Sequence, residues 1–353
     1  MNPGDRIGDY EILAELGAGG MGHVYRARHL ILDRLVALKT LSPHHRSNPH
    51  LVERFLKEAR AAARLNHPNI VQIYDFGQSG DLHYLTMEYI EGESLQKVVN
   101  RGPLPEARAI ELVRIACNAL GVAHAAGLVH RDVKPDNLML ARTGELKLVD
   151  LGVAKQLDED ISLTQTGQAI GTPHYISPEQ IRGEKKIDGR ADLYSLGATL
   201  FHLLTGKPPF RGETAALIMS MHLYQPVEVS QLSPGVGRVI RKLMEKDPAL
   251  RYPDAAAAER DLAQLGPGAA APPPASASPA NPAPITPNPA LAEASVKAVE
   301  VELGRHVGPM ARVLVKRAAR TSASLRELIR AVEGEIEDAA ARRAFRAAVD
   351  KLR

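Results

Sequence analysis

The run HRDVKPDN occupies residues 130–137 and carries the most specific chemistry of this chain. It sets Asp132, Lys134 and Asn137 on one short loop, where they offer a base, a fixed cation and a metal ligand. These are the groups that move a phosphoryl group onto a hydroxyl. The alternative is a charged turn that holds these residues by chance, and the number of matched positions argues against it. We therefore predict phosphoryl transfer at this loop.

A second acidic position follows a short apolar segment. Residues 146–149 predict a strand that leads directly into Asp150-Leu151-Gly152, so the carboxylate of Asp150 is delivered at a sharp turn. Carboxylate oxygens suit Mg²⁺, and Asn137 can supply a second oxygen on the metal side. Asp132 is then placed to accept the proton of the acceptor hydroxyl, while Lys134 offers a point charge to the transferred group.

A glycine-rich segment predicts the nucleotide end of the site. Residues 16–24 read LGAGGMGHV and contain G-x-G-x-x-G, a pattern that a dinucleotide-binding fold also uses when a helix begins at the glycines. Here residues 23–28 look like a strand, so we expect a strand–turn–strand flap whose backbone N–H groups approach phosphates. Lys39 ends the next apolar run and Glu58 lies on the following helix, which predicts a Lys39–Glu58 pair.

Composition narrows the class of protein. The chain has 353 residues, 44% of them hydrophobic, and a net charge of +3, which marks no strong nucleic-acid-binding field. Its single cysteine, Cys117, lies in an apolar helical pattern and cannot form a disulfide within the chain, which fits a reducing cytoplasm. The first ten residues show no secretory signal and no apolar run is long enough to span a membrane, so we expect a cytoplasmic protein.

The sequence divides into three parts. Residues 266–291 are rich in Pro and Ala without apolar periodicity and predict a disordered linker between a large domain, 1–265, and a small one, 292–353. Within the large domain, strand signals dominate up to about residue 90 and helical signals follow it. The expected helices there are 105–126, 190–205, 212–222 and 234–245. This organisation is α+β, with a β-rich lobe of about 1–90 and a helical lobe of about 91–265.

The small C-terminal domain predicts three or four short helices. Ser324 and Glu327 form the sequence of a capping box that opens one of them. Its polar faces carry many arginines, which indicate either a solvated face or a surface for an acidic or phosphorylated partner. We expect a module that binds another protein, dimerises or regulates the large domain.

The motifs together resemble a eukaryotic-type protein kinase domain, and more closely its bacterial serine/threonine (Hanks-type) branch, in a cytosolic form without a transmembrane segment. They occur in the order of that family: the 17–22 glycines, 36–39, Glu58, 130–137, 150–152, 171–173, 177–179 and 192–197. The resemblance covers residues of about 10–265. It implies a bilobal fold, ATP and Mg²⁺ (which Mn²⁺ can replace), and transfer of phosphate to serine or threonine of protein substrates in intracellular signalling. No nucleic-acid partner is expected, because the net charge is low.

The resemblance also implies a role for individual residues. ATP would be bound by Leu16, Gly17, Ala18, Gly19, Gly20, Met21, Gly22, Val24, Ala37, Lys39, Met87, Glu88, Ile90 and Met139. Among these, Val24, Ala37 and Met139 would sandwich the adenine. Backbone groups of Glu88 and Ile90 would bind its edge, and Met87 would be the gatekeeper. Catalysis would use Asp132, Lys134, Lys39, Glu58 and Thr172, and metal would bind Asn137 and Asp150. The structural residues would be Arg131, Asp192, Glu179 and Arg251, with Asp192 bracing the 130–137 loop and Glu179 pairing with Arg251.

Four positions refine this expectation. Lys134 in the loop indicates a serine or threonine acceptor, and Val153 favours threonine modestly, because in the family a β-branched residue there tends to accompany threonine. The family has Phe where this chain has Leu151, which leaves the metal ligand intact and makes the packing of active and inactive forms less certain. Ser177 replaces the family's Ala before Pro178-Glu179, a minor change.

The segment between Gly152 and Gly171 predicts a switch. A phosphate on Thr164 or Thr166 would add about 1.5 to 2 negative charges and could pair with Arg131, beside the catalytic aspartate. We expect both threonines to be autophosphorylated, largely in trans within a transient or stable homodimer. A loop whose hydroxyls are merely solvated is the alternative.

Other functions remain open from sequence alone. A pseudokinase scaffold would usually lack the lysine, base or metal ligand, and all are present here. The output of the protein could instead lie in the C-terminal module, with phosphorylation as its control. A small-molecule kinase of related fold is disfavoured by the intact 171–179 segment, which in the family shapes a groove for protein substrates.

Overall fold

The structure is a computed structural model of the 353-residue chain. It describes residues 1–19, 22–41, 49–150, 173–265, 293–307, 311, 314–315, 318–319, 322, 324–334 and 339–349, without the side chains of 19, 49–51, 54–55, 57–58, 293–295, 305–307 and 339–340. The chain forms two compact units, Met1–Ala270 and Ala271–Arg353. The segment with Thr164, Thr166 and Thr172, and the glycine-loop positions Gly20 and Met21, lie outside the described residues.

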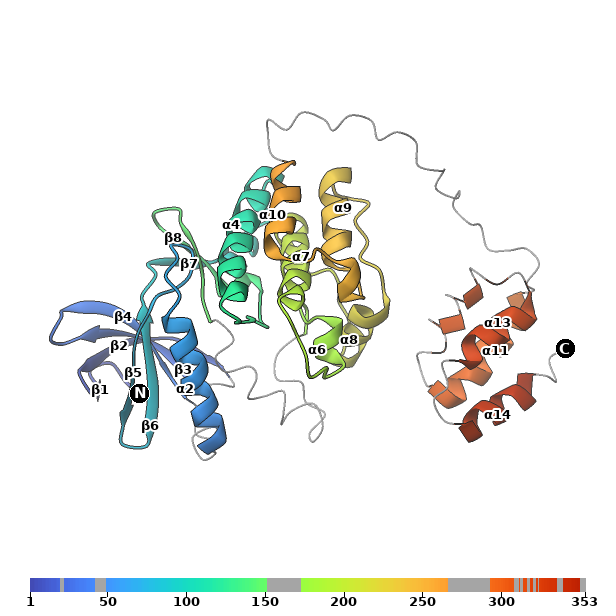
Figure 1. Ribbon diagram of the computed structural model, residues 1–353, viewed down its shortest axis with the longest axis horizontal. Helices are drawn as coiled ribbons and strands as arrows, with labels where there is room; N and C mark the ends of the chain where they lie inside the picture. Colours follow the sequence, from blue (N-terminus) through green and yellow to red (C-terminus); the bar gives the residue numbers. More distant parts are fainter. Residues whose placement is uncertain are drawn as a thin grey trace. The chain divides into compact units, whose positions relative to one another are not determined.

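The first lobe is built on one antiparallel sheet with the strand order β1-β2-β3-β4-β6-β5 (Figure 1). The strands are β1 (Arg6–Ile7), β2 (Tyr10–Gly19), β3 (Gly22–His29), β4 (Arg34–Thr40), β5 (Ile73–Ser79) and β6 (Leu82–Glu88). Alternation sends Ile12, Tyr25 and Leu38 into a small core on one face of this sheet. Ala37 and Leu85 point to the other face, which helix α2 (Pro49–Ala63) covers with Ala59.

The glycine-rich segment joins two strands. β2 and β3 pair in antiparallel register, with Gly17 opposite Val24 and Gly19 opposite Gly22. A dinucleotide fingerprint would need a helix to begin at these glycines, so the paired strands exclude that alternative.

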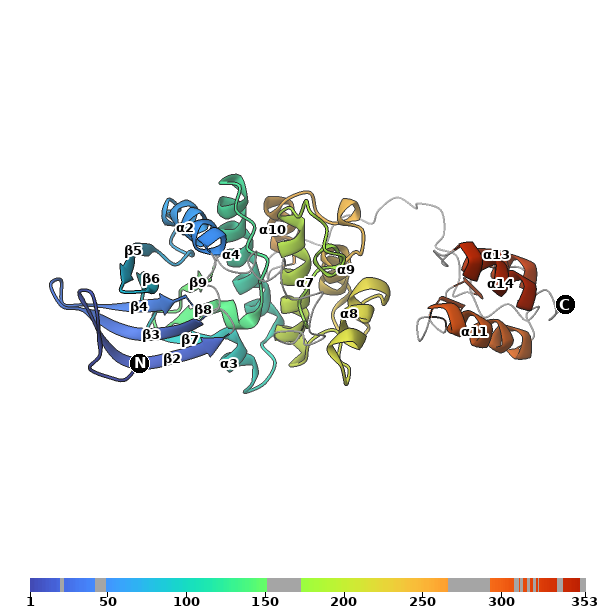
Figure 2. The same ribbon diagram turned by 90° about the horizontal axis from the view of Figure 1, so that it is seen from below.

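A second, three-stranded sheet lies between the first sheet and the helices (Figure 2). It consists of β7 (Gly92–Ser94), β8 (Leu138–Ala141) and β9 (Leu146–Leu148). Position 92 requires glycine, because a Cβ there would lie 2.1 Å from the carbonyl oxygen of Leu140. Ile70 forms a parallel bridge with Leu148, so the segment before β5 is joined to this sheet.

The second lobe is helical. Its helices are α3 (Leu95–Val99), α4 (Glu106–Ala125), α6 (Pro178–Ile181), α7 (Arg190–Thr205), α8 (Ala215–Tyr224), α9 (Pro234–Leu243) and α10 (Ala255–Ala263), with the short 3₁₀ turns η1 (Pro135–Asn137) and η2 (Pro248–Leu250). Residues 191–203 of α7 are all buried, which makes it the central helix of this lobe. The predicted helices are present, but α8 begins later than expected, because Thr214 caps it by accepting a hydrogen bond from Leu217 N.

The second unit has a hydrophobic core of its own. It contains α11 (Glu293–Val307), α13 (Leu325–Glu333) and α14 (Ala339–Val349). Val299, Leu328 and Phe345 from the three helices are fully or almost fully buried together. Ser324 caps α13 by accepting a hydrogen bond from Glu327 N, as the sequence predicts. The expected α+β bilobal fold with a small helical C-terminal module is therefore confirmed.

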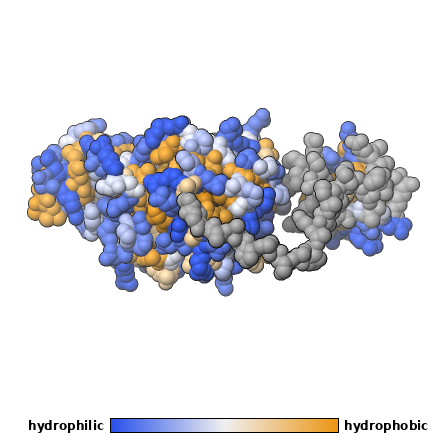
Figure 3. Space-filling model, turned by 90° about the horizontal axis from the view of Figure 1, so that it is seen from above, coloured by the Kyte–Doolittle hydropathy of each residue, from blue (hydrophilic) through white to orange (hydrophobic). Residues whose placement is uncertain are grey.

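The surface of the first unit and its helices have the character of an ordinary globular domain. The coloured part of the first unit in Figure 3 mixes hydrophilic and apolar side chains. Among the described residues, none of the helices has the length and apolar character needed to cross a membrane. Cys117 is buried on α4, and burial raises the pKa of its thiol to about 12, which fits a role in packing.

Candidate active site

The 130–137 loop is held by one buried carboxylate. Asp192, near the start of α7, accepts hydrogen bonds from His130 N at 2.8 Å and from Arg131 N at 2.7 Å. Arg131 has a φ of +62°, a conformation that a non-glycine residue adopts only when its surroundings enforce it. The sequence assigned this bracing role to Asp192, and the structure places its carboxylate against the loop as that role requires.

His124 completes the support of Asp192, and sequence reasoning did not find it. Its Nε2 lies 2.8 Å from Oδ2 of Asp192, and because a carboxylate can only accept, His124 donates. Gly189 packs against the His124 ring, where a Cβ would come within 2.4 Å. His124 lies in the last turn of α4, and nothing in its sequence neighbourhood indicates its distant partner Asp192.

Two predicted residues, Lys134 and Asn137, contact the predicted base Asp132. Lys134 Nζ donates to Oδ2 of Asp132 at 2.9 Å, and Asn137 Nδ2 donates to the same oxygen at 3.1 Å and to the Asp132 carbonyl at 2.8 Å. Burial acts to lower the pKa of Lys134, but the nearby charge and hydrogen bond of Asp132 outweigh it and raise the pKa. The ammonium therefore stays charged beside the predicted base.

His130 joins this loop to the strand that carries Asp150. Its Nε2 lies 2.9 Å from the Val149 carbonyl, which can only accept, and its Nδ1 lies 3.2 Å from Asp132 N, which can only donate. Both contacts are satisfied by the neutral ring with the proton on Nε2. The backbone N–H of Val149 also donates to the carbonyl of Asn137 at 3.0 Å. The two predicted metal ligands, Asn137 and Asp150, are thereby held on adjoining segments.

Asp150 pairs with a lysine of the first lobe. Lys39 Nζ donates to Oδ1 of Asp150 at 2.7 Å, and Asp150 has a φ of +57°. Burial acts to raise the pKa of Asp150, but the charge and hydrogen bond of Lys39 outweigh it and lower the pKa. Glu58 lies on α2, but its side chain is outside the described residues, so the predicted Lys39–Glu58 pair stays a prediction.

The donor set around Asp150 suits a magnesium ion bound together with phosphates. Asn137 directs Nδ2 toward Asp132, which leaves its Oδ1 for another partner. Among the described residues, there is no group of three His, Cys, Asp or Glu side chains that could bind a metal alone. One carboxylate, one amide oxygen and phosphate oxygens are the ligands that Mg²⁺ accepts in nucleotide sites.

The predicted adenine site lies where the two sheets meet. Ala37 on β4 pairs with Met87 on β6, and Val24 on β3 pairs with Lys39, while Met139 lies on β8 of the second sheet. Met87 is buried at the predicted gatekeeper position. The predicted adenine residues thus come from strands of both sheets.

The described glycine-loop residues, Gly17 to Gly19 and Gly22, lie on the β2–β3 hairpin with Leu16.

The segment after β6 has a polar anchor that the sequence did not predict. Glu88 N donates to the carbonyl of Gln72 at 2.8 Å, so only the Glu88 carbonyl could serve a nucleotide. The Glu88 side chain pairs with Lys147 of β9 at 2.7 Å. Ile90 follows at the same connection, packed against the main core. The pair joins the two sheets at the predicted nucleotide edge.

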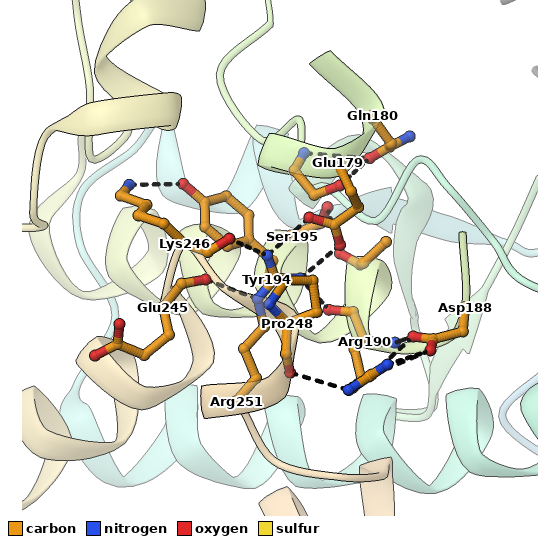
Figure 4. Close-up of polar contacts among 12 residues, drawn as sticks. Glu179, Gln180, Asp188, Arg190, Tyr194, Ser195, Glu245, Lys246, Pro248 and Arg251 are labelled. Carbon is orange, nitrogen blue, oxygen red and sulfur yellow. Dashed lines mark hydrogen bonds and ion pairs between the residues drawn. The ribbon is translucent and has the colours of Figure 1, made fainter. Parts of the chain in front are cut away.

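Glu179 and Arg251 form a buried ion pair (Figure 4). Arg251 donates to both carboxylate oxygens of Glu179, at 2.6 and 2.8 Å, and the Arg251 side chain is 0% exposed. Gln180, next to Glu179 on α6, donates from Nε2 to the carbonyl of Arg131 at 2.9 Å. The structure thus brings the predicted pair together and ties its helix to the 130–137 loop.

Comparison with known proteins identifies the larger unit. Residues 10–261 match the family described as "Protein kinase domain". The chain belongs to the protein kinase family. Residues 294–353 match a second family, described as a domain of unknown function (DUF8082).

Similar proteins are bacterial serine/threonine kinases. The chain is 42% identical over 269 residues to "Serine/threonine-protein kinase PknB" of Mycobacterium leprae, covering 73% of this chain and 43% of that protein. It is 40% identical over 266 residues to "Serine/threonine-protein kinase PrkC" of Bacillus subtilis, covering 73% and 41%. The chain thus spans less than half the length of these curated relatives.

The crystal structure of the Mycobacterium tuberculosis PknI kinase domain is similar to this kinase domain, with a TM-score of 0.62 and 28% identity. The similarity covers 75% of this chain and 100% of that one.

Proposed function

We propose that this chain is a serine/threonine protein kinase that transfers the γ-phosphoryl group of ATP to hydroxyls of protein substrates. The observation that carries the proposal is the convergence of Lys134 and Asn137 on the carboxylate of Asp132. The ion pair of Lys39 with Asp150 supplies the phosphate-side charges. Membership of the family, and the printed names of its bacterial relatives, support the same activity.

The chemistry follows from what each group can do. Asp132 accepts the proton of the acceptor hydroxyl while the hydroxyl oxygen forms a bond to the γ-phosphorus of ATP. The bond between the γ-phosphorus and the bridging oxygen then breaks, which releases ADP. Lys134 offsets the negative charge that spreads over the transferred group. Asn137 and Asp150 would hold Mg²⁺, which neutralises the phosphate charges when bound, and Lys39 orients the phosphates.

The substitution Asp132→Asn tests the proposal, with Asp136→Asn as its matched control. Both changes remove one carboxylate charge from the same loop, but Asp136 is exposed. We expect Asp132→Asn to lower phosphate transfer to a generic protein acceptor by a factor of at least about 10² while ATP binding persists. Asp136→Asn should retain most activity. Equal activity of the two variants would reject Asp132 as the base.

The activation segment belongs to the same proposal. We propose that Thr164 and Thr166, which lie outside the described residues, are autophosphorylated in trans within a transient or stable homodimer. A phosphate there could pair with Arg131, whose backbone is already held by Asp192. Mixing tagged, inactive Asp132→Asn protein with wild type and ATP tests this. Mass spectrometry should find both phosphates on the inactive copy. An unphosphorylated inactive copy beside a phosphorylated wild type would indicate that the reaction occurs in cis.

A threonine preference is the finer part of the acceptor proposal. Lys134 beside Asp132 suits either hydroxyl, whereas Val153 favours threonine only through the family resemblance. Two peptides that differ only in Ser or Thr at the acceptor position would decide the preference. A higher kcat/KM for the threonine peptide is expected.

For the C-terminal module we propose a partner-binding or regulatory role. Its separate hydrophobic core supports a unit that acts apart from catalysis. Comparing the full chain with a chain ending at residue 291, for both kinase activity and co-purifying proteins, tests this role. Unchanged activity with loss of a partner indicates binding, and changed activity indicates regulation.

A further inference from the structure

A half-buried lysine lies next to the Glu179–Arg251 pair, in a position that the proposed mechanism does not use. Lys246 follows α9, and its Nζ donates to the hydroxyl of Tyr194 at 3.1 Å (Figure 4). The same ammonium lies 4.8 Å from the centre of the Phe210 ring. Tyr194 itself is fully buried on α7. Among the described residues, no carboxylate forms an ion pair with Lys246, so aromatic groups surround its charge.

These aromatic groups connect Lys246 to the segment that precedes α6. The Tyr194 hydroxyl lies 2.9 Å from Nδ1 of His222 on α8, and the Phe210 ring packs edge-on against His222 at 4.8 Å. His174 Nδ1 donates to the carbonyl of Phe210 at 3.1 Å, because that carbonyl can only accept. A continuous set of contacts therefore runs from Lys246 to His174.

Residue 174 belongs to the stretch that lies beside the catalytic loop. Three residues after it, Ser177 opens α6 with a capping box, and Gln180 of that helix donates to the Arg131 carbonyl. A protein hydroxyl presented to Asp132 is expected to approach along residues 173–177, because they lead directly into α6, whose Gln180 contacts the residue before Asp132. The shape of residues 173–177 therefore bears on binding of the acceptor.

We propose that Lys246 is a positioning residue for the protein substrate: held by Tyr194 and Phe210, it keeps residues 173–177 in the shape that receives the acceptor. The proposal rests on the proposed kinase function. Lys246 touches neither ATP nor the reacting atoms, so its effect should appear in the KM for protein and not in the KM for ATP.

The charge of Lys246 is expected to matter, because a cation gains energy on an aromatic face that a neutral amine does not. Burial, followed by the nearby charge of Arg251, lowers the pKa of Lys246 to about 7.

The groups that face Lys246 change little near neutral pH. Burial lowers the pKa of His222 to about 3 and lowers the pKa of His174, so both rings are largely neutral there. Burial raises the pKa of Tyr194, which therefore stays protonated. The other facing groups, Glu179, Glu245, Arg190 and Arg251, are carboxylates and guanidinium groups. Of this set, Lys246 is the group expected to change charge between pH 6.5 and 8.5.

Steady-state kinetics of the full chain at pH 6.5, 7.5 and 8.5 test the proposal. For wild type, the KM for a protein acceptor should rise about threefold to tenfold across this range as Lys246 loses its proton, with the KM for ATP unchanged. Lys246→Met should show the high KM at every pH. Lys246→Arg, which stays charged, should keep a lower KM that does not depend on pH.

Two further variants serve as checks. Tyr194→Phe removes the hydroxyl that links Lys246 to His222 and should raise the KM for protein as Lys246→Met does. Lys242→Met is the matched control. Lys242 lies on α9, and its ammonium is 4.2 Å from the centre of the Tyr252 ring, away from residue 174. It should behave as wild type. A wild-type KM for protein in Lys246→Met, or equal changes in the KM values for protein and ATP, would overturn the proposal.

Hydrogen exchange gives a readout that does not need catalysis. Amides of residues 174–182 should exchange several times faster in Lys246→Met than in wild type and Lys242→Met. Unchanged protection would also overturn the proposal. If wild type transfers no phosphate at all, the kinase function fails, and the exchange data still decide whether Lys246 positions this stretch.

Discussion

Lys39 and Asp150, which are 111 positions apart in the chain, form a 2.7 Å hydrogen bond between Nζ and Oδ1. The bond joins a strand of the first lobe to the turn that follows β9. It places a fixed positive charge beside the carboxylate predicted to bind metal.

We expect Lys39→Met to lower kcat/KM for phosphate transfer by a factor on the order of 10² to 10³, because the phosphates lose a charge held in a partly buried site. Thermal unfolding should change little, since the Lys39–Asp150 pair is only partly buried. Lys97→Met, an exposed lysine of α3, is the matched control and should keep full activity. A variant at position 39 with wild-type kcat/KM would contradict this role.

Asp192→Asn should reduce kcat without weakening ATP binding. The two oxygens of Asp192 each accept one N–H group, from His130 and from Arg131. The amide of asparagine has one oxygen and one NH₂ group, so it can accept from only one of them, and the loop loses support. The free energy of unfolding should fall by about 1 to 3 kcal/mol, because buried donors are left without partners. Steady-state kinetics measure kcat, and nucleotide titration measures ATP binding. His124→Gln should have a milder effect of the same kind, and a larger one would assign the main support to His124.

Removing one member of the Glu179–Arg251 pair should destabilise the kinase domain strongly. Arg251→Ala leaves the Glu179 carboxylate buried without its partner, at an expected cost of about 3 to 5 kcal/mol. Urea denaturation measures this change. The matched control is Arg101→Ala, which breaks a similar two-bond pair with Glu93 in which Arg101 is 62% exposed. That control should lose far less stability, and equal losses would show that burial is not the cause.

The stability of the protein should depend on pH through Lys246. The pKa of Lys246 is lowered to about 7 in the folded state, so between pH 7 and about 10 the unfolded chain binds the additional proton. The free energy of unfolding therefore rises with pH in this window, by at most about 1.4 kcal/mol per pH unit from this group.

Lys246→Met should remove this rise, and the variant should be more stable than wild type near pH 6, where the buried charge is fully present. Urea denaturation at pH 6, 7, 8 and 9 measures both effects. Parallel curves for the variant and wild type would show that Lys246 does not titrate with a lowered pKa.

The sequence alone was sufficient for the kinase fold and for most of the proposed site. The 130–137 run and the Asp-x-Gly turn are local patterns in which neighbouring residues share one task, and such patterns can be recognised without a structure. Helix positions followed from apolar periodicity, and α7 begins and ends where its pattern predicts. Where a cap decided the boundary, as at Thr214 of α8, periodicity placed the start too early.

Only the tertiary structure showed which polar groups meet across the fold. The contact of Lys39 with Asp150 is one example, and it leaves the predicted pairing of Lys39 with Glu58 as a prediction. His124, Lys147 and Lys246 gave no sequence signal of their function, because their partners Asp192, Glu88 and Tyr194 lie on other elements. Local propensity and motif spacing depend on neighbouring residues, and the sequence therefore determined the family and the chemistry. Burial, pKa shifts and long-range hydrogen bonds depend on how distant segments pack, and these only the folded structure could decide.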